Sequence, residues 1–172
     1  AVTVVPTASA QERNETLQPA PTAREGSSYE RYEGPGDFVS NGGNTCMGRE
    51  ITIRASRFGV TNGTPGTDVI AGTDGNDVIY GRGGNDIICG FDGDDTIYGD
   101  HNDPDDPSGG LDTINGGNGD DDIYGGPQQD FIQGSAGGYV IYGDLPTSSH
   151  GTQDNIEGGN GNDVIVGEPG SD

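Results

Sequence analysis

The sequence predicts an all-β fold in which short strands wind into a coil with two opposed parallel sheets. Residues 72–98 consist of three nine-residue units, GTDGNDVIY, GRGGNDIIC and GFDGDDTIY. The units share Gly at positions one and four, Asp at position six and Ile at position eight, and such a fixed period indicates a repeat architecture. Only 28% of the chain is hydrophobic, there is no Trp, and 34 residues are Gly, a composition that disfavours a conventional globular core.

The N-terminal quarter shows no helical or strand period. Residues 11–45 are rich in Pro, Ser, Thr, Gly and Glu, so we expect 1–45 to be a flexible linker or stalk, or an extended arm that orders against a partner. Ala8-Ser9-Ala10 resembles a signal-peptidase site, either as a signal remnant or within a mature N-terminus. Either interpretation favours export.

Residues 46–62 are expected to cap the first coil. Within 50–60, apolar Ile51 and Ile53 alternate with Thr52 and Arg54, which predicts a short amphipathic strand. A repeat stack needs such a cap because its end rung otherwise exposes the apolar core to water.

The repeats occupy residues 63–172 and form about eleven half-coils. Each unit is a glycine-rich turn followed by a strand, so two units make one full turn and alternate units enter opposite sheets. The eighth positions are Ile70, Ile79, Ile88, Ile97, Ile114, Ile123, Ile132, Ile141, Ile156 and Ile165.

Two longer intervals, around 99–109 and 143–151, are loop-like. If each is an enlarged loop within one half-coil, the ninth-position Tyr80, Tyr98, Tyr124 and Tyr142 fall on one sheet as a stacked ladder. If the interval around 99–109 instead hides an extra half-coil, the ladder splits between the sheets. We take the count in which each interval is one enlarged loop.

The charge distribution disfavours anionic partners and indicates that the chain binds cations. Residues 62–172 contain 22 Asp or Glu but one basic residue, Arg82, so nucleic acid and anionic membranes are disfavoured. No apolar run is long enough for a membrane helix. A thin isoleucine seam cannot offset the ordering entropy of over a hundred residues, and divalent cations would supply the missing counter-charge.

The sixth-position carboxylates recur in phase with the turns. Asx-turns would explain isolated cases, but a regular series predicts Ca²⁺, which accepts carboxylate and carbonyl oxygens more readily than Mg²⁺ does. The series on the edge that leads into one sheet is Asp68, Asp86, Asp112, Asp130, Asp154 and Asp172, and on the other edge Asp77, Asp95, Asp121 and Asp163.

These units resemble the calcium-binding nonapeptide repeats of the RTX (hemolysin-type) family, and the chain resembles a short secreted bacterial member. The resemblance implies a right-handed parallel β-roll in which each Ca²⁺ lies between successive turns. The ligands would be the sixth-position Asp residues and turn carbonyls, among them those of Gly75, Gly84, Gly93, Gly119 and Gly161.

The two cysteines, Cys46 and Cys89, suit either one disulfide in an oxidising compartment or two unrelated buried thiols. Cys89 is expected on the outer face of its sheet. Short secreted RTX-like proteins have a Cys before the first repeat and a later D-x-x-C-G, which Asp86-Ile87-Ile88-Cys89-Gly90 matches. This resemblance favours a Cys46–Cys89 bridge.

Departures from the pattern predict local exceptions. Tyr139 replaces Asp in GSAGGYVIY, which puts the neighbouring sites on that edge in question, and Gln128 replaces the fourth Gly of its unit. Asp100, Asp103, Asp105 and Asp106 are expected to form a solvated acidic loop rather than another cation site.

No catalytic constellation is present in the sequence, since His101 and His150 fall in the loops without an apolar pocket. We therefore expect a secreted, non-enzymatic calcium-binding protein whose folding is driven by Ca²⁺, with a structural role at a cell surface or in a matrix. The alternatives are a calcium-stabilised filament built by self-association and an export or folding module of a larger RTX protein.

Overall fold

The computed structural model describes residues 44–57, 59–101, 109–144 and 152–167. All of them belong to the compact unit that comprises residues 34–172. The expected N-terminal arm, with the export signal and its alternatives, therefore lies almost wholly outside the described residues. Within these ranges the regular structure is strand and turn, and no helix is long and apolar enough to span a membrane.

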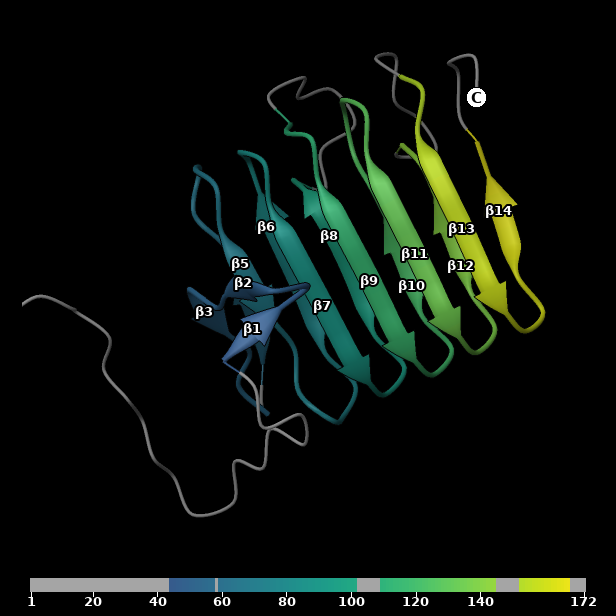
Figure 1. The fold of residues 1–172 in the computed structure, drawn as a ribbon, viewed down its shortest axis with the longest axis horizontal. Coiled ribbons are helices and arrows are strands. Elements are labelled where there is room, and N and C mark those ends of the chain that lie inside the picture. The colour runs from purple at the N-terminus through teal and green to yellow at the C-terminus, as the bar shows by residue number, and fades with distance from the viewer. Residues whose placement is uncertain (1–43, 58, 102–108, 145–151, 168–172) are drawn as a thin grey trace, which may run out of the picture. The chain divides into compact units, whose positions relative to one another are not determined.

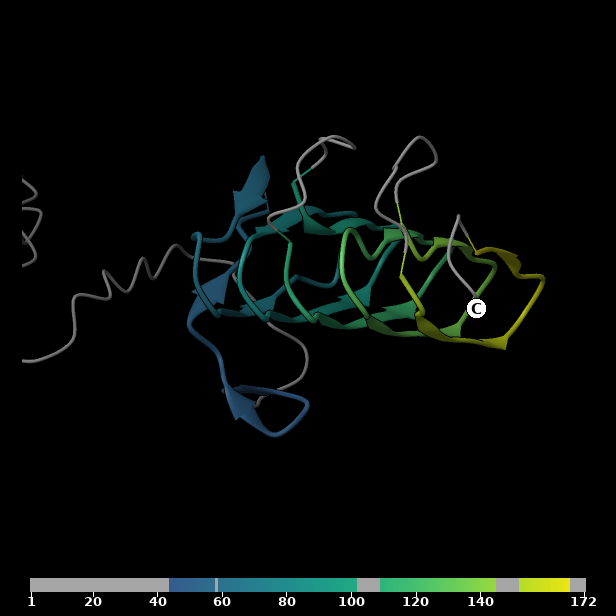
Figure 2. The same cartoon turned by 90° about the horizontal axis from the view of Figure 1, so that it is seen from above.

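Two parallel six-stranded sheets face each other, and successive strands alternate between them (Figures 1 and 2). We call them the odd and even sheets, after their strand labels. The odd sheet has the order β3 (Ile53–Arg54), β5 (Val69–Ala71), β7 (Ile87–Asp92), β9 (Thr113–Asn118), β11 (Phe131–Ala136) and β13 (Asn155–Asn160). The even sheet has the order β4 (Val60–Asn62), β6 (Val78–Arg82), β8 (Thr96–Asp100), β10 (Asp122–Tyr124), β12 (Val140–Tyr142) and β14 (Val164–Val166). This arrangement is a parallel β-roll, as predicted.

The core is a seam of isoleucines between the sheets. In the repeats, each eighth-position Ile pairs in register with the Ile of the next coil, for example Ile70 with Ile88 and Ile79 with Ile97. The eight from Ile70 to Ile141 have no exposed surface. Burial fades at the last coil, where Ile156 is half-buried and Ile165 is 48% exposed.

The strand register shows how the two longer intervals are accommodated. Thr96 pairs with Asp122 across the first interval and Tyr142 pairs with Val166 across the second, so each interval is an enlarged loop within a single half-coil. The four ninth-position tyrosines consequently stack on the even sheet, with ring centroids 4.6, 4.7 and 5.0 Å apart. These spacings match the separation of hydrogen-bonded strands, and the single-half-coil count is confirmed.

The capping segment is more broken than expected. Instead of one strand over 50–60, it forms an antiparallel hairpin, β1 (Thr45–Cys46) and β2 (Arg49–Glu50), before β3 and β4 join the sheets. The single-strand prediction for 50–60 was wrong because only Ile53–Arg54 is a strand of the odd sheet there, and the chain then turns, with Gly59 at φ of 125°, and enters the even sheet at Val60. Ile53 still packs on the core, in register with Ile70.

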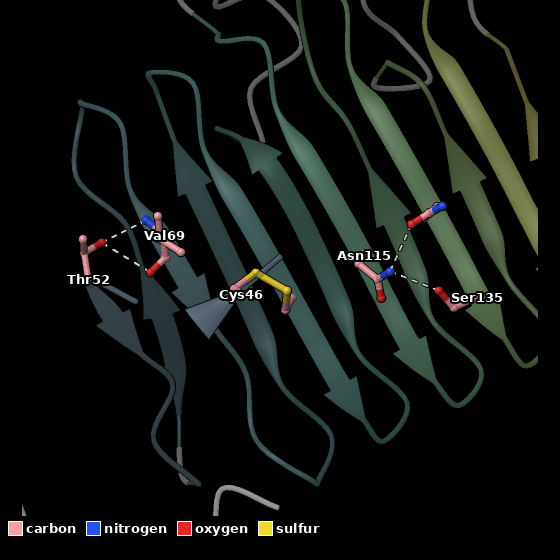
Figure 3. The surroundings of a disulfide bond; sticks show 7 residues. Cys46, Thr52, Val69, Asn115 and Ser135 are labelled. Carbon is pink, nitrogen blue, oxygen red and sulfur yellow. Dashed lines mark hydrogen bonds between the residues drawn. A yellow bond between two sulfur atoms is a disulfide. The ribbon is translucent and has the colours of Figure 1, made fainter. Parts of the chain in front are cut away.

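A disulfide fixes this hairpin to the odd sheet. Cys46 and Cys89 are bonded, with an S–S distance of 2.06 Å, and both are buried (Figure 3). Nearby, the Thr52 hydroxyl accepts the Val69 N–H at 2.9 Å and extends the contact between the cap and β5. The bridge expected from the resemblance is present.

Replacement of Ile97 by Ala tests the seam. We expect the free energy of unfolding, measured by urea titration at a fixed calcium concentration, to fall by about 3 kcal/mol, because a fully buried Ile leaves a cavity. The matched variant Ile165→Ala removes the same atoms from a 48% exposed position and should lose less than about 1 kcal/mol. Equal losses in the two variants would contradict the described core.

Candidate metal centre

The sixth-position aspartates are carried by the turns at both edges of the roll. Each one ends a glycine-rich turn and precedes a strand, so its carboxylate lies inside the coil beneath the turn. In seven consecutive units the aspartate is no more than 6% exposed, namely Asp68, Asp77, Asp86, Asp95, Asp112, Asp121 and Asp130. Burial of a carboxylate is costly unless its charge is compensated.

From Asp86 to Asp154, one carboxylate oxygen of each odd-edge aspartate links two successive turns, and Asp95 and Asp121 do the same on the even edge. The Asp68 N–H donates to Asp86 Oδ1 at 2.8 Å, and the same bond connects the sixth positions of later coils. In each further pair the N–H of the first residue donates to Oδ1 of the second, at 2.8–2.9 Å. The pairs are Asp77 and Asp95, Asp86 and Asp112, Asp95 and Asp121, Asp112 and Asp130, and Asp130 and Asp154. The carboxylates are thereby held at fixed positions along each edge.

The second oxygen is left without a protein donor in the central coils. Within the described residues, the Oδ2 atoms of Asp86, Asp95, Asp112, Asp121 and Asp130 are buried and have no hydrogen-bond partner. A buried charged oxygen with no partner is strongly unfavourable, and a bound cation would remove the penalty.

Glycine keeps open the space into which these oxygens point. A Cβ on Gly81 would lie 2.6 Å from Asp86 Oδ2 and still closer to the Gly99 carbonyl oxygen of the next coil. Gly90 and Gly125 show the same pair of neighbours, an Oδ2 from their own turn and a glycine carbonyl oxygen from the next. Only a residue without a side chain leaves room for both oxygens.

This donor set fits calcium. Among the described residues no three His, Cys, Asp or Glu side chains come together as a metal site, so an ion would have to take backbone oxygens as well. Ca²⁺ binds carboxylate and carbonyl oxygens together in a flexible shell, and the glycine-rich turns present both.

The fourth-position glycines allow the turns to stack closely. Gly84, Gly93, Gly119 and Gly161 have φ between 99° and 146°, a region that side chains disfavour. A Cβ on Gly84 would also collide with the backbone of Gly66 in the preceding coil. Gly75 is different, because it has neither a positive φ nor a close neighbour at its Cβ position.

In the first turn on each edge, a threonine supplies the hydrogen-bond donors that Oδ2 lacks in the central coils. Asp68 Oδ2 accepts the Thr64 N–H at 2.7 Å and its hydroxyl at 2.8 Å. Asp77 Oδ2 accepts the Thr73 N–H at 2.6 Å and its hydroxyl at 3.0 Å. Both oxygens are satisfied by protein, so these two aspartates fit an ion less well than the central five, and their role as ligands stays a prediction.

The last predicted ligands are less enclosed. Asp154 is half-buried and continues the series through its bond from Asp130. Asp163 is half-buried and accepts the Tyr139 N–H at a longer 3.3 Å. Asp172 lies outside the described residues.

A scan against protein families identifies the repeats. The RTX calcium-binding nonapeptide repeat matches in four copies over residues 62–97, 108–144 and 151–172, which is more than half of the chain. The chain belongs to the RTX calcium-binding nonapeptide repeat family. No enzyme family was detected, and searches of curated proteins and of solved structures returned no match.

Burial gives the RTX aspartates unusual proton affinities. Desolvation, opposed only in part by the backbone hydrogen bond to Oδ1, raises the pKa of Asp86 and Asp95 to about 8 and that of Asp112 to about 7. It raises the pKa of Asp121 to about 6 and, with the charge of Asp112 adding to it, that of Asp130 to about 10. Calcium requires the deprotonated form, so Ca²⁺ and protons compete for these oxygens.

Two buried carboxylates were missed from the sequence. Asp100 is 3% exposed and accepts the Gly110 N–H, and Asp144 is fully buried and accepts the Thr152 N–H at 3.1 Å. The expectation of a solvated loop was wrong for Asp100, because its carboxylate turns inward and closes the base of the enlarged loop. The sequence feature that could have indicated these two buried aspartates is the Tyr-Gly-Asp at the start of both loops, at 98–100 and 142–144.

Other departures have modest effects. Gln128 adopts φ of 87° in place of the missing glycine, yet the following Asp130 keeps its place in the series. His101 is exposed and lines a shallow surface pocket with Asn62, Tyr80 and Arg82. His150, Asp103, Asp105 and Asp106 lie outside the described residues.

Acid should partly replace calcium. The raised pKa values mean that the folded, ion-free roll binds protons more tightly than the unfolded chain, whose aspartates titrate near 3.8. This stabilisation is fully present below that value and is lost as the pH rises through the folded-state pKa values, from about 6 for Asp121 to about 10 for Asp130. In calcium-depleted protein, the β signal in far-ultraviolet circular dichroism should therefore fall between pH 5 and pH 8.

Paired variants separate this effect from general charge repulsion. Asp95→Asn removes a buried titrating group and should flatten the dependence on pH, whereas Asp122→Asn removes an exposed charge from the outer face of β10 and should leave the slope unchanged. A β signal that rises from pH 5 to pH 8 without calcium would contradict the pKa shifts.

Proposed function

We propose that this RTX domain is a secreted, non-enzymatic calcium-binding protein whose folding is driven by Ca²⁺, and that it has a structural role at a bacterial cell surface or in an extracellular matrix. The observation that carries the proposal is the row of five buried Oδ2 atoms without protein partners along the two edges of the roll. The family match supports calcium as the ion.

Folding and binding are coupled because the sites exist only in the wound chain. The ligands of one ion come from turns 18 or more residues apart, and the unfolded chain does not bring them together. The free energy of metal binding then becomes free energy of folding. The 22 acidic residues of 62–172, opposed by one arginine, give the ion-free chain a strong tendency to expand.

The proposed ligands follow from the same geometry. The central set comprises Asp86, Asp95, Asp112, Asp121 and Asp130 together with glycine carbonyl oxygens of adjoining turns. Asp154 and Asp163 extend the series, and we retain Asp68, Asp77 and Asp172 as predicted members. When bound, calcium would neutralise the oxygens and hold successive turns together.

Secretion and domain organisation are inferred from independent features. A disulfide is typical of proteins that leave the reducing cytosol, and RTX repeats are typical of secreted bacterial proteins. We propose an arm or linker over 1–45, a cap over 46–62 and the calcium-binding roll over 63–172.

Adjacent aspartates provide a matched test. Asp121→Asn changes a buried carboxylate without a partner for Oδ2, and Asp122→Asn changes the exposed neighbour. Circular dichroism of the unmodified protein should gain β signal between chelator and 10 mM calcium. Asp121→Asn should raise the calcium midpoint about tenfold, because calcium affinity follows the charge of the ligand set; Asp122→Asn should leave it nearly unchanged. Equal midpoints for both variants, or no gain of signal with calcium, would refute the proposal.

A second candidate function is calcium-stabilised self-assembly. Val164 and Ile165 in β14 are 54% and 48% exposed, and the strand has an unpaired edge within the described residues. The cap carries Arg49, Arg54 and Arg57, which would complement the acidic repeats of another copy in a head-to-tail contact.

Light scattering at saturating calcium tests this assembly. We expect a mass above that of one chain and a loss of the larger species in Ile165→Asp, which places a charge in the contact. Thr113→Asp adds the same charge on the outer face of β9, in the middle of the odd sheet, and serves as the control. A monomer at high protein concentration would exclude the assembly without affecting the calcium proposal.

A further inference from the structure

One turn of the even edge is built differently from all others in the described repeats. Turn 134–139 ends in Tyr139, in the position that Asp occupies in the other nonapeptide units. Its side chain is 1% exposed and belongs to the core cluster formed by the isoleucines. The phenol is thus inside the coil, where the other turns hold a carboxylate.

The phenol ring occupies the space that an aspartate oxygen has elsewhere. A Cβ on Gly134 would lie 2.7 Å from Tyr139 Cδ2 and 3.0 Å from Cε2. At Gly81, Gly90 and Gly125 the corresponding neighbour is an Oδ2 atom. The Gly158 carbonyl oxygen still approaches from the next coil, as in the other turns, but it faces carbon in place of a carboxylate.

The hydroxyl makes a link between turns that needs no metal. Tyr139 Oη donates to the Gly117 carbonyl oxygen at 2.7 Å, across 22 residues, and so joins turn 134–139 to turn 116–121 on the same edge. Burial raises the pKa of Tyr139 to about 12, which keeps the phenol protonated as a donor. A neutral hydrogen bond and a packed ring here connect two coils that the general scheme would connect through an ion.

We propose that Tyr139 takes the place of a calcium ion: turn 134–139 binds no Ca²⁺ and is held by a metal-independent aromatic clamp. The even edge is then divided into a calcium-binding series before the clamp, with Asp95 and Asp121, and a separate site after it, at Asp163. The odd edge keeps an uninterrupted series from Asp86 to Asp154. This inference rests on the proposed calcium-driven function.

Counting bound ions by native mass spectrometry and calorimetry tests the clamp. Tyr139→Asp restores the repeat pattern, so the variant should bind at least one more Ca²⁺ per chain than the unmodified protein. Asn155→Asp adds an equal charge at an exposed position on β13 and should bind the same number as the unmodified protein. An unchanged ion count in Tyr139→Asp would overturn the inference.

A second variant keeps the inference testable if Tyr139→Asp does not fold. Tyr139→Phe retains the ring and removes the hydroxyl, so the ion count should stay the same, while the roll becomes easier to unfold at fixed calcium. Loss of an ion in this variant would show that the phenol oxygen is a ligand and would overturn the clamp. If the unmodified protein binds no calcium at all, the proposed function fails; if it binds calcium and the Asp variant gains none, the clamp alone fails.

Discussion

Uncompensated carboxylate charge inside the coil is the constraint on which the rest of the structure depends. Each turn must be tight enough to carry the chain from one sheet to the other, and this puts a sixth-position aspartate under the backbone. One oxygen is used to join neighbouring turns, as in the 2.8 Å bond from the Asp86 N–H to Asp112. The other has no donor in the central coils, and the isoleucine seam is too thin to offset several such groups.

The turns meet this constraint in three chemically distinct ways. At the N-terminal end, threonine side chains and N–H groups satisfy Asp68 and Asp77. In the central coils the free oxygens and facing carbonyls suit calcium. At Tyr139 the carboxylate is absent and a phenol forms the connection. The repeat therefore keeps one register throughout but varies in how successive coils are joined, and the N-terminal turns and the Tyr139 turn depend less on the ion than the central turns do.

The sequence predicted the periodic part of the structure well, and the physical reason is that nine-residue spacing fixes both register and side-chain direction. The two sheets, the isoleucine seam and the tyrosine ladder followed from it, and the enlarged loops did not shift the register. The β1–β2 hairpin, the inward carboxylates of Asp100 and Asp144, and the threonine bonds at Asp68 and Asp77 did not follow. Each depends on a contact made at a single place, which a repeating pattern does not encode. The Cys46–Cys89 bridge came from resemblance, since spacing alone left two free thiols open.

The most direct measurement is an anomalous-difference electron-density map from crystals grown with calcium. The account predicts peaks between successive turns along both edges, each within about 2.3–2.6 Å of an aspartate Oδ2 and of glycine carbonyl oxygens. Asp86, Asp112 and Asp130 should each contact such a peak on the odd edge. A fully wound roll at saturating calcium whose edges contain no ion, with the same aspartate oxygens buried and unpaired, would contradict it.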